Sequence, residues 1–377
     1  MCSVGKLFLL CVLTVQMAYG AEAQRPEVFI NPHSGRDENS GATADGKDQN
    51  GPVKSFARAF SLVAPAGVVR IVAGKEPIRV PLIVTRGGLP GQPLTIEGNG
   101  AVIDLGTDIT DGPWRADGVE WILERDVPAH TRVCQSSQIF VDQQPLWVPH
   151  PKIPQKPEDG ALRITSEGRF AVTFPPGKSP KNSRVILTAQ DQQSGVHIAG
   201  DTGHVTIRNL TVRYAGNDGF NFHGKGVGVR LENIKALCCG DQGISSHGER
   251  ETIVDGAEVA FCGSRAGGVV DIDKSVTSYR NLLIHHNRRG SFYFTGKRHV
   301  LENVVSFANG GGAQLPKSGG NLEVSHSVAL DAQAHLADEY AAERAGLGAL
   351  LKAAQESLKK LEVLPYPGVP FSAADAP

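Results

Sequence analysis

Between residues 205 and 330 the sequence repeats a short polar and apolar phrase at intervals of 22 to 25 residues. The five copies are Arg208–Val212, Glu232–Ala236, Asp255–Val259, Arg280–Ile284 and Glu302–Ser306. A period in the low twenties is typical of stacked units, each too thin to bury its own apolar side. This region therefore predicts a solenoid.

Apolar residues within each unit alternate, as in Leu210, Val212 and Tyr214, and this period of two indicates a strand. A glycine-rich corner and a second short alternating run follow, such as Gly219–His223 and Gly243–His247. Several short strands per unit, with corners that need glycine, predict an all-β fold, a right-handed parallel β-helix.

Asparagine recurs at one corner of the units, at Asn209, Asn233, Asn281 and Asn303. Parallel strands lie about 4.8 Å apart, so side-chain amides at one corner can hydrogen-bond from unit to unit. We interpret the column as structural, and the sequon at Asn209 as incidental for the same reason.

The N-terminus predicts an export signal over residues 1–20, with Lys6 before the apolar run Leu7–Ala18. That run is too short to span a bilayer, so we expect an exported periplasmic or extracellular protein without membrane insertion. The formal net charge of −1 gives no indication of nucleic-acid binding. Cys239 and Cys262 fall at the same offset in adjacent units, which is compatible with either a disulfide or two buried thiols.

The chain divides by pattern into a first segment at residues 25–105, an insertion at 106–193, the repeats at 194–332, a C-terminal helix at 333–363 and a disordered tail at 364–377. The insertion loses the period, and its alternating runs predict a small antiparallel β subdomain. Its tryptophans Trp114, Trp121 and Trp147 either stack on sugars or pack the subdomain's own core.

The first segment resembles the start of secreted pectate-lyase-like β-helix proteins. The resemblance is carried by Phe29–Pro32, the Gly/Asp loop at Ser40-Gly41, the helical spacing of Phe56 to Ala64, Gly67–Ile71 and Gly91–Gly98. It implies the β-helix architecture, and it implies a polysaccharide partner because members cleave acidic or neutral polysaccharides, although some do no chemistry.

Aligning the units places Phe220, Phe222, Ile244, Ser246, Val270 and Ile272 inward, and so predicts two outward columns. One contains Asn221, Ser245, Asp271 and Tyr293, and the other contains His223, His247, Asp273 and Thr295. Imidazoles beside carboxylates suit general acid and base catalysis, and the carboxylates of Asp271 and Asp273 suit a calcium ion that neutralises a uronate. The alternative is an ordinary solvated face of the β-helix.

Basic residues flank these columns and suit an anionic polymer. They are Lys225, Arg265, Lys274, Arg288, Arg289, Lys297 and Arg298.

Two motif sets resemble enzyme families of this architecture. Asn217-Asp218-Gly219, Gly240-Asp241-Gln242 and Ser246-His247-Gly248 resemble the polygalacturonase pattern, with Gln242 in place of its second Asp. Asp271, Asp273 and Lys274, followed by Lys297-Arg298, are similar to the acids, Lys and Arg of alginate-lyase-like and chondroitinase-like β-helix lyases, where the acids bind calcium and the Lys abstracts a proton.

The leading hypothesis is a polysaccharide lyase that acts on a uronate-containing polymer by β-elimination. In it Lys274, His223 or His247 takes the C5 proton, Asp273 acts through the cation with Asp271, and Tyr293 or Arg289 assists the leaving oxygen. Substrate contacts are predicted at Asn221, Asp218, Asp241, Arg265 and Arg298. A glycoside hydrolase, which would use Asp218 and Asp241, and a non-catalytic glycan-binding or surface protein are the alternatives.

Overall fold

The computed structural model describes residues 24–46, 48–126, 139–142, 144–146, 160–189, 193–263, 267–310 and 315–330. The predicted signal peptide, C-terminal helix and tail lie outside these residues, as do Trp147 and Cys134. Within the described part, no helix has both the length and the apolar character needed to cross a membrane.

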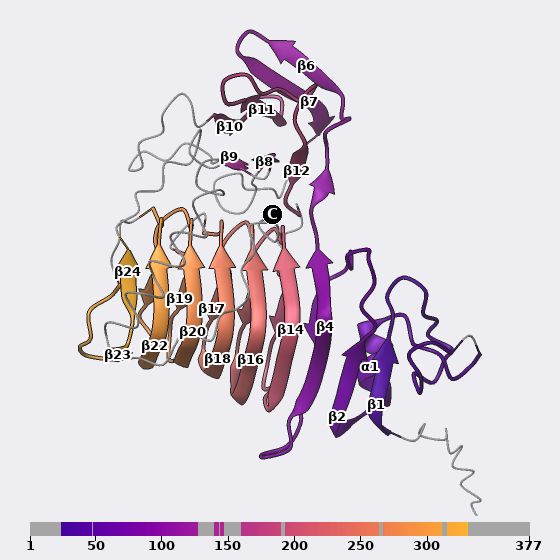
Figure 1. Ribbon diagram of the computed structural model, residues 1–377. Helices are drawn as coiled ribbons and strands as arrows, with labels where there is room; N and C mark the ends of the chain where they lie inside the picture. Colours follow the sequence, from indigo (N-terminus) through magenta and orange to yellow (C-terminus); the bar gives the residue numbers. More distant parts are fainter. Residues whose placement is uncertain are drawn as a thin grey trace, which may run out of the picture.

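The repeat region forms a right-handed parallel β-helix, as the sequence predicts. Its longest sheet is parallel throughout and runs the length of the coil (Figure 1). Its strands are β1 (Arg25–Ile30), β2 (Val63–Ile71), β4 (Leu94–Asp104), β14 (Val205–Arg213), β16 (Lys225–Leu237), β18 (Glu249–Ala260), β20 (Val276–His285), β22 (Arg298–Phe307), β23 (Leu322–Ser325) and β24 (Val328–Leu330).

A second parallel sheet forms another side of the coil from short strands. They are β3 (Leu82–Val84), β13 (Val196–Ile198), β15 (Phe220–Phe222), β17 (Ile244–Ser246), β19 (Val269–Asp271) and β21 (Phe292–Phe294). Because each strand contains three residues, its two end residues point inward and its middle residue points outward. This sheet therefore presents a single outward column along its centre.

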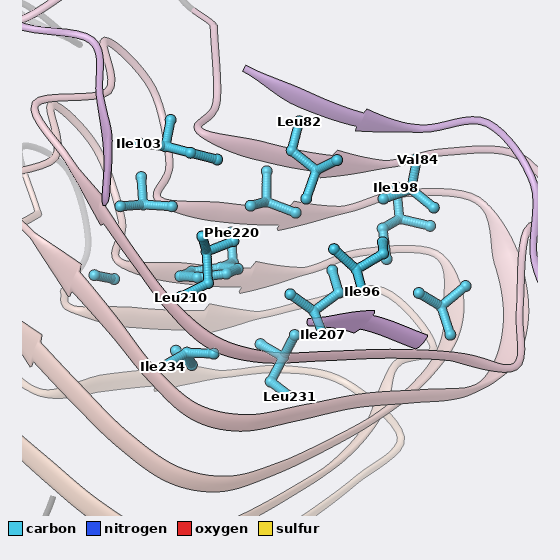
Figure 2. Close-up of a cluster of buried hydrophobic side chains, with 14 of the residues drawn as sticks. Leu82, Val84, Ile96, Ile103, Ile198, Ile207, Leu210, Phe220, Leu231 and Ile234 are labelled. Carbon is cyan, nitrogen blue, oxygen red and sulfur yellow. The ribbon is translucent and has the colours of Figure 1, made fainter. Parts of the chain in front are cut away.

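Apolar side chains from both sheets fill the interior of the coil (Figure 2). Ile207 and Leu210 of β14 and Phe220 of β15 are buried in one cluster with their counterparts in neighbouring units. The helix α1 (Phe56–Leu62) adds Phe56, Ala59 and Phe60 to the same cluster. It begins at Ser55, whose side chain accepts the Arg58 N–H at 3.1 Å, which is the N-cap geometry.

The asparagine column is a hydrogen-bonded ladder. Asn233 donates its amide to Asn209 Oδ1 at 2.8 Å, and Asn303 donates to Asn281 Oδ1 at 2.6 Å. All four asparagines have φ between 49° and 56°, and Gly256, with φ 77°, takes the position in the unit that lacks an asparagine. Asparagine tolerates this left-handed conformation better than other side chains, so it serves both as the corner and as the link between units.

We expect Asn281→Ala to lower the free energy of unfolding by about 3 kcal/mol. Asn281 accepts from Asn303 and donates to Asp255 at 2.7 Å, so two bonds worth about 1 kcal/mol each are lost. Alanine also meets a cost of about 1 kcal/mol at φ 54°. Asn281→Gly removes only the two hydrogen bonds, so it should lower the free energy of unfolding by about 2 kcal/mol, measured by chemical denaturation. An equal loss of stability in both variants would contradict a role for the left-handed conformation at this corner.

A second left-handed corner is built from residues that seldom adopt this conformation. Tyr214, Cys238, Phe261, His286 and Ala308 have φ between 50° and 58°. The first three of these side chains are buried in a cluster with Phe140 and Ile186 of the insertion. Such corners cost free energy in non-glycine residues, and here the side chains are needed to hold the insertion against the coil.

The insertion contains two four-stranded antiparallel sheets, drawn above the ends of the coil strands (Figure 1). One is made of β6 (Trp114–Asp117), β7 (Glu120–Asp126), β10 (Ala161–Ile164) and β11 (Arg169–Thr173). The other is made of β5 (Thr107–Asp108), β8 (Ile139–Val141), β9 (Gln144–Leu146) and β12 (Val185–Leu187). The two share an apolar core of their own, as the loss of period predicts.

Cys239 and Cys262 are not joined by a disulfide in this structure, and both side chains are buried. The backbone N–H of Cys239 donates to Cys262 Sγ at 3.3 Å. Of the two sequence-based alternatives for this pair, the structure has the buried thiols.

Candidate functional site

A groove of about 350 Å³ lies on the outer face of the short-stranded sheet. We call it the histidine groove, and it is lined by Pro81, Ile83, Gln193, Ser194, His197, Asn217, Asn221 and His223. Its wall combines an isoleucine that is 51% exposed with amide, hydroxyl and imidazole groups. An apolar surface beside a few convergent polar groups is typical of a small-molecule or sugar site.

Three histidine rings from successive units lie close together on the outer face of the short-stranded sheet. His223 and His247 directly follow β15 and β17, and their rings stack with centroids 4.3 Å apart and planes inclined by 4°. His197 is the middle residue of β13, and its ring lies 6.1 Å from that of His223. The structure thus confirms the predicted neighbourhood of His223 and His247 and adds His197.

A buried carboxylate organises the floor of the groove. Asp218 accepts hydrogen bonds from Asn221 Nδ2 at 2.5 Å, from Ser245 Oγ at 2.6 Å and from the backbone N–H of Gln242 at 3.0 Å. Asn221 is 4% exposed, and its Oδ1 has no hydrogen-bond partner. Because its Nδ2 is held by Asp218, the orientation of the Asn221 amide beneath the groove is fixed.

Burial shifts the protonation of these groups. Loss of solvation lowers the pKa of His197, although Asn221 and Asp218 act in the opposite direction. Burial, with His247 and His197 nearby, lowers the pKa of His223 to about 4. Burial also raises the pKa of Asp218, against the effect of its three donors and His247. Both His197 and His223 are therefore neutral at pH 7 and able to accept a proton.

Arg250 supports the backbone at His223 from within the coil. It is 1% exposed, and its guanidinium donates to the backbone carbonyls of Gly200, Thr202 and His223. Gly226 leaves the space, because a Cβ there would lie 2.1 Å from Arg250 Nη1. The backbone that carries His223 is thus fixed by a buried cation.

One part of the predicted alignment is wrong. The sheet register pairs Ser246 with Asp271 and Ser245 with Val270, so Asp271 points into the coil and is fully buried. The predicted inward pair Val270 and Ile272 is displaced by one residue. The unit before β19 is 25 residues long, and a one-residue slip in a strand exchanges its two faces.

Asp271 does not form the predicted calcium pair with Asp273. It accepts hydrogen bonds from Thr277 Oγ1 at 2.8 Å and from the Tyr279 hydroxyl at 2.9 Å inside the coil. Asp273 is exposed and accepts the backbone N–H of Gly248 at 2.9 Å. Among the described residues, no group of three or more His, Cys, Asp or Glu side chains is arranged to hold a metal ion.

The other predicted residues are spread over the surface. Lys274 pairs with Glu249 at 2.8 Å, and Arg298 pairs with Glu323 at 3.0 Å. Tyr293 is 49% exposed on β21, three strands from Asn221 and so about 14 Å away. None of these three lines the histidine groove.

Three further predicted residues are placed as follows. Asp241 is buried and accepts the side-chain amide of Gln242. Arg289 is half-buried, and neither residue lines the histidine groove. Arg265 lies outside the described residues.

His197 was not predicted, although the sequence holds a signal for it. It lies 24 residues before Asn221, and Gly195–Ile198 follows the same glycine and alternation pattern as Gly219–Phe222. The asparagine phrase that marks the later units is missing before β13, because the insertion precedes it. Arg250 was also missed, since a strand position alone does not distinguish a buried arginine from a surface one.

Comparison with known proteins agrees with this architecture. Residues 194–339 match the family model described as right handed beta helix region. The match covers the repeat region and agrees with the right-handed parallel β-helix that these residues form. No curated protein matches its sequence significantly.

Several solved structures are similar to this chain at low identity. XylC in complex with xylose has a TM-score of 0.46 and 11% identity over 75% of this chain and 65% of that one. Pectate lyase Pel9A has a TM-score of 0.37 and 12% identity over 84% and 79%. The GH136 lacto-N-biosidase from Eubacterium ramulus has a TM-score of 0.33 and 11% identity over 75% and 45%. The chain thus spans less than two thirds of XylC.

Proposed function

We propose that this protein is a carbohydrate-active enzyme whose substrate binds in the histidine groove, and that it cleaves a uronate-containing polysaccharide by β-elimination. The observation that carries the proposal is the neutral imidazole of His197 beside the amide of Asn221, which Asp218 holds in place. Both groups lie in the groove beside an apolar wall, and this combination suits a sugar ring with a proton to be removed.

The reaction assigns a role to each group. His197 takes the C5 proton of the uronate, the electron pair forms the C4–C5 double bond, and the C4–O bond breaks. The leaving oxygen takes a proton from water, because His223 is neutral at pH 7 and has no acidic proton to give. Asn221, held by Asp218, lines the groove and helps to fix the surface against which the ring is oriented.

Hydrolysis is the second candidate, and the raised pKa of Asp218 favours it. A carboxylic acid whose pKa is raised by burial is better suited to protonate a glycosidic oxygen than an exposed one. Two observations argue against hydrolysis. The Asp218 carboxylate accepts hydrogen bonds from three protein donors, and its side chain is almost fully buried. Elimination is therefore the leading proposal.

A polysaccharide panel tests the proposal directly. The protein is incubated with uronate-containing and neutral polysaccharides, while reducing ends and the ultraviolet absorbance of unsaturated uronates are followed together. Elimination raises both signals. A rise in reducing ends without ultraviolet absorbance would indicate hydrolysis through Asp218. The absence of both signals across the panel would reject catalysis and favour the non-catalytic glycan-binding alternative.

A further inference from the structure

A second concave site lies in the insertion, apart from the histidine groove. It has a volume of about 680 Å³ and is lined by residues of β6, β7 and the segment around residues 180–184. We call it the tryptophan pocket, after Trp114 and Trp121. None of its residues lines the histidine groove. In Figure 1, β6 and β7 lie at the end of the insertion farthest from the coil.

The two tryptophans form a fixed wall. Trp114 donates its indole N–H to the carbonyl of Ile109 at 2.8 Å and packs edge-on against Phe174 with ring centroids 5.9 Å apart. Trp121 is half-buried on the same core, but its indole N–H has no acceptor within the part of the chain that the structure describes. A rigid aromatic wall with a free donor is suited to the C–H face and hydroxyls of a pyranose.

Some polar side chains of the tryptophan pocket have protein partners, and others have none among the described residues. Arg184 is paired with Asp108 at 3.0 Å, and Asn182 is held by its own turn through Ser179 and Gly177. The ammonium of Lys181 lies 5.4 Å from the centre of the Trp121 ring and has no carboxylate partner among the described residues. Asp111 is exposed and likewise has no described hydrogen bond or ion pair.

The charge of the available groups indicates the ligand. One cation, Lys181, and one carboxylate, Asp111, leave the pocket without net charge, because the Arg184 and Asp108 charges neutralise each other. The carboxylate of a uronate would be attracted by the ammonium of Lys181 but repelled by the carboxylate of Asp111. Sugar hydroxyls, in contrast, donate to a carboxylate and accept from an ammonium at once.

We propose that the tryptophan pocket is an accessory binding site for neutral pyranose residues of a glycan. The ring lies against Trp121, Asp111 accepts from its hydroxyls, and Lys181 donates to one of them. The site does no chemistry. It goes beyond the proposed reaction, since it holds a glycan at a distance from the histidine groove.

Binding of short oligosaccharides tests this site without any need for turnover. Neutral trisaccharides of glucose, galactose, xylose and mannose, and uronate trisaccharides of the same length, are titrated into the full chain by calorimetry. We expect a neutral trisaccharide to bind, Trp121→Ala to weaken it at least tenfold, and Asp111→Asn to weaken it about fivefold. Asp45→Asn, which makes the same charge change on the exposed N-terminal loop, is the matched control.

The outcomes separate the two proposals. Asp111→Asn changes a surface side chain, so it remains informative if Trp121→Ala fails to fold. Unchanged binding in Asp111→Asn, binding of uronates alone, or no binding across the set would each overturn the accessory site. Turnover of a polysaccharide together with any of these results would leave the histidine-groove proposal intact. Binding of a neutral trisaccharide without turnover of any polysaccharide would support the accessory site and reject the histidine-groove proposal.

Discussion

Replacing His197 by glutamine is expected to lower kcat by on the order of 10² to 10⁴, the usual contribution of a general base. Glutamine keeps hydrogen-bonding capacity at this half-buried position but cannot accept the C5 proton at neutral pH. The rate is measured as the rise in unsaturated-uronate absorbance on the polymer found in the panel. Since His197 is the outward residue of β13, we expect the β-helix to remain folded, which far-ultraviolet circular dichroism checks.

The pH profile gives an independent test of the same role. Burial lowers the pKa of His197 from its ordinary value of 6.5, so the base form persists to lower pH. The acidic limb of kcat/KM should therefore lie below pH 6.5 in the wild type. His33→Gln, a change at a histidine of the N-terminal loop, is the matched control. Full turnover in His197→Gln would remove this residue from the mechanism.

The second large effect concerns stability and comes from Asp271 inside the coil. Burial raises its pKa to about 7 from an ordinary value of 3.8, although Thr277 and Tyr279 act in the opposite direction. Between these two values the folded state holds a proton that the unfolded state has released. This contribution to stability is therefore complete below pH 3.8 and is lost as pH rises through 7, by about 4 kcal/mol in total.

His299 masks this effect in the wild type. Its Nδ1 lies 3.8 Å from Asp271 Oδ2, and burial lowers its pKa to about 4. The folded state has then released a proton that the unfolded state keeps up to its ordinary pKa of 6.5, so this contribution is lost as pH falls. Between pH 4 and 6.5 the Asp271 contribution to the free energy of unfolding falls with rising pH, while the His299 contribution rises.

The comparison with Asp271→Asn isolates the carboxyl group. We expect the stability of Asp271→Asn relative to the wild type to rise by about 4 kcal/mol between pH 4 and pH 7.5, measured by urea denaturation at each pH. Asp45→Asn again serves as the control for loss of a charge on the surface. A difference that does not change with pH would show that the Asp271 carboxyl titrates alike in both states.

The sequence by itself determined the architecture. The period of 22 to 25 residues, the alternation within each unit and the asparagine corner predict a parallel β-helix, because each is a local requirement of a thin stacked unit. The Asn281 and Asn303 link follows from the same periodicity. The neighbourhood of His223 and His247 was also predictable, since their units have equal lengths in this stretch.

Only the tertiary structure decided which side chains face the groove. The step from β17 to β19 is one residue longer than the step from β15 to β17, and the place that absorbs this difference decides which side chains of β19 face outward. His197 stands directly after the insertion, where the repeat signal is interrupted, and Arg250 is buried because three carbonyls converge on it. Such long-range pairing depends on register and packing between units, which the pattern within one unit does not contain.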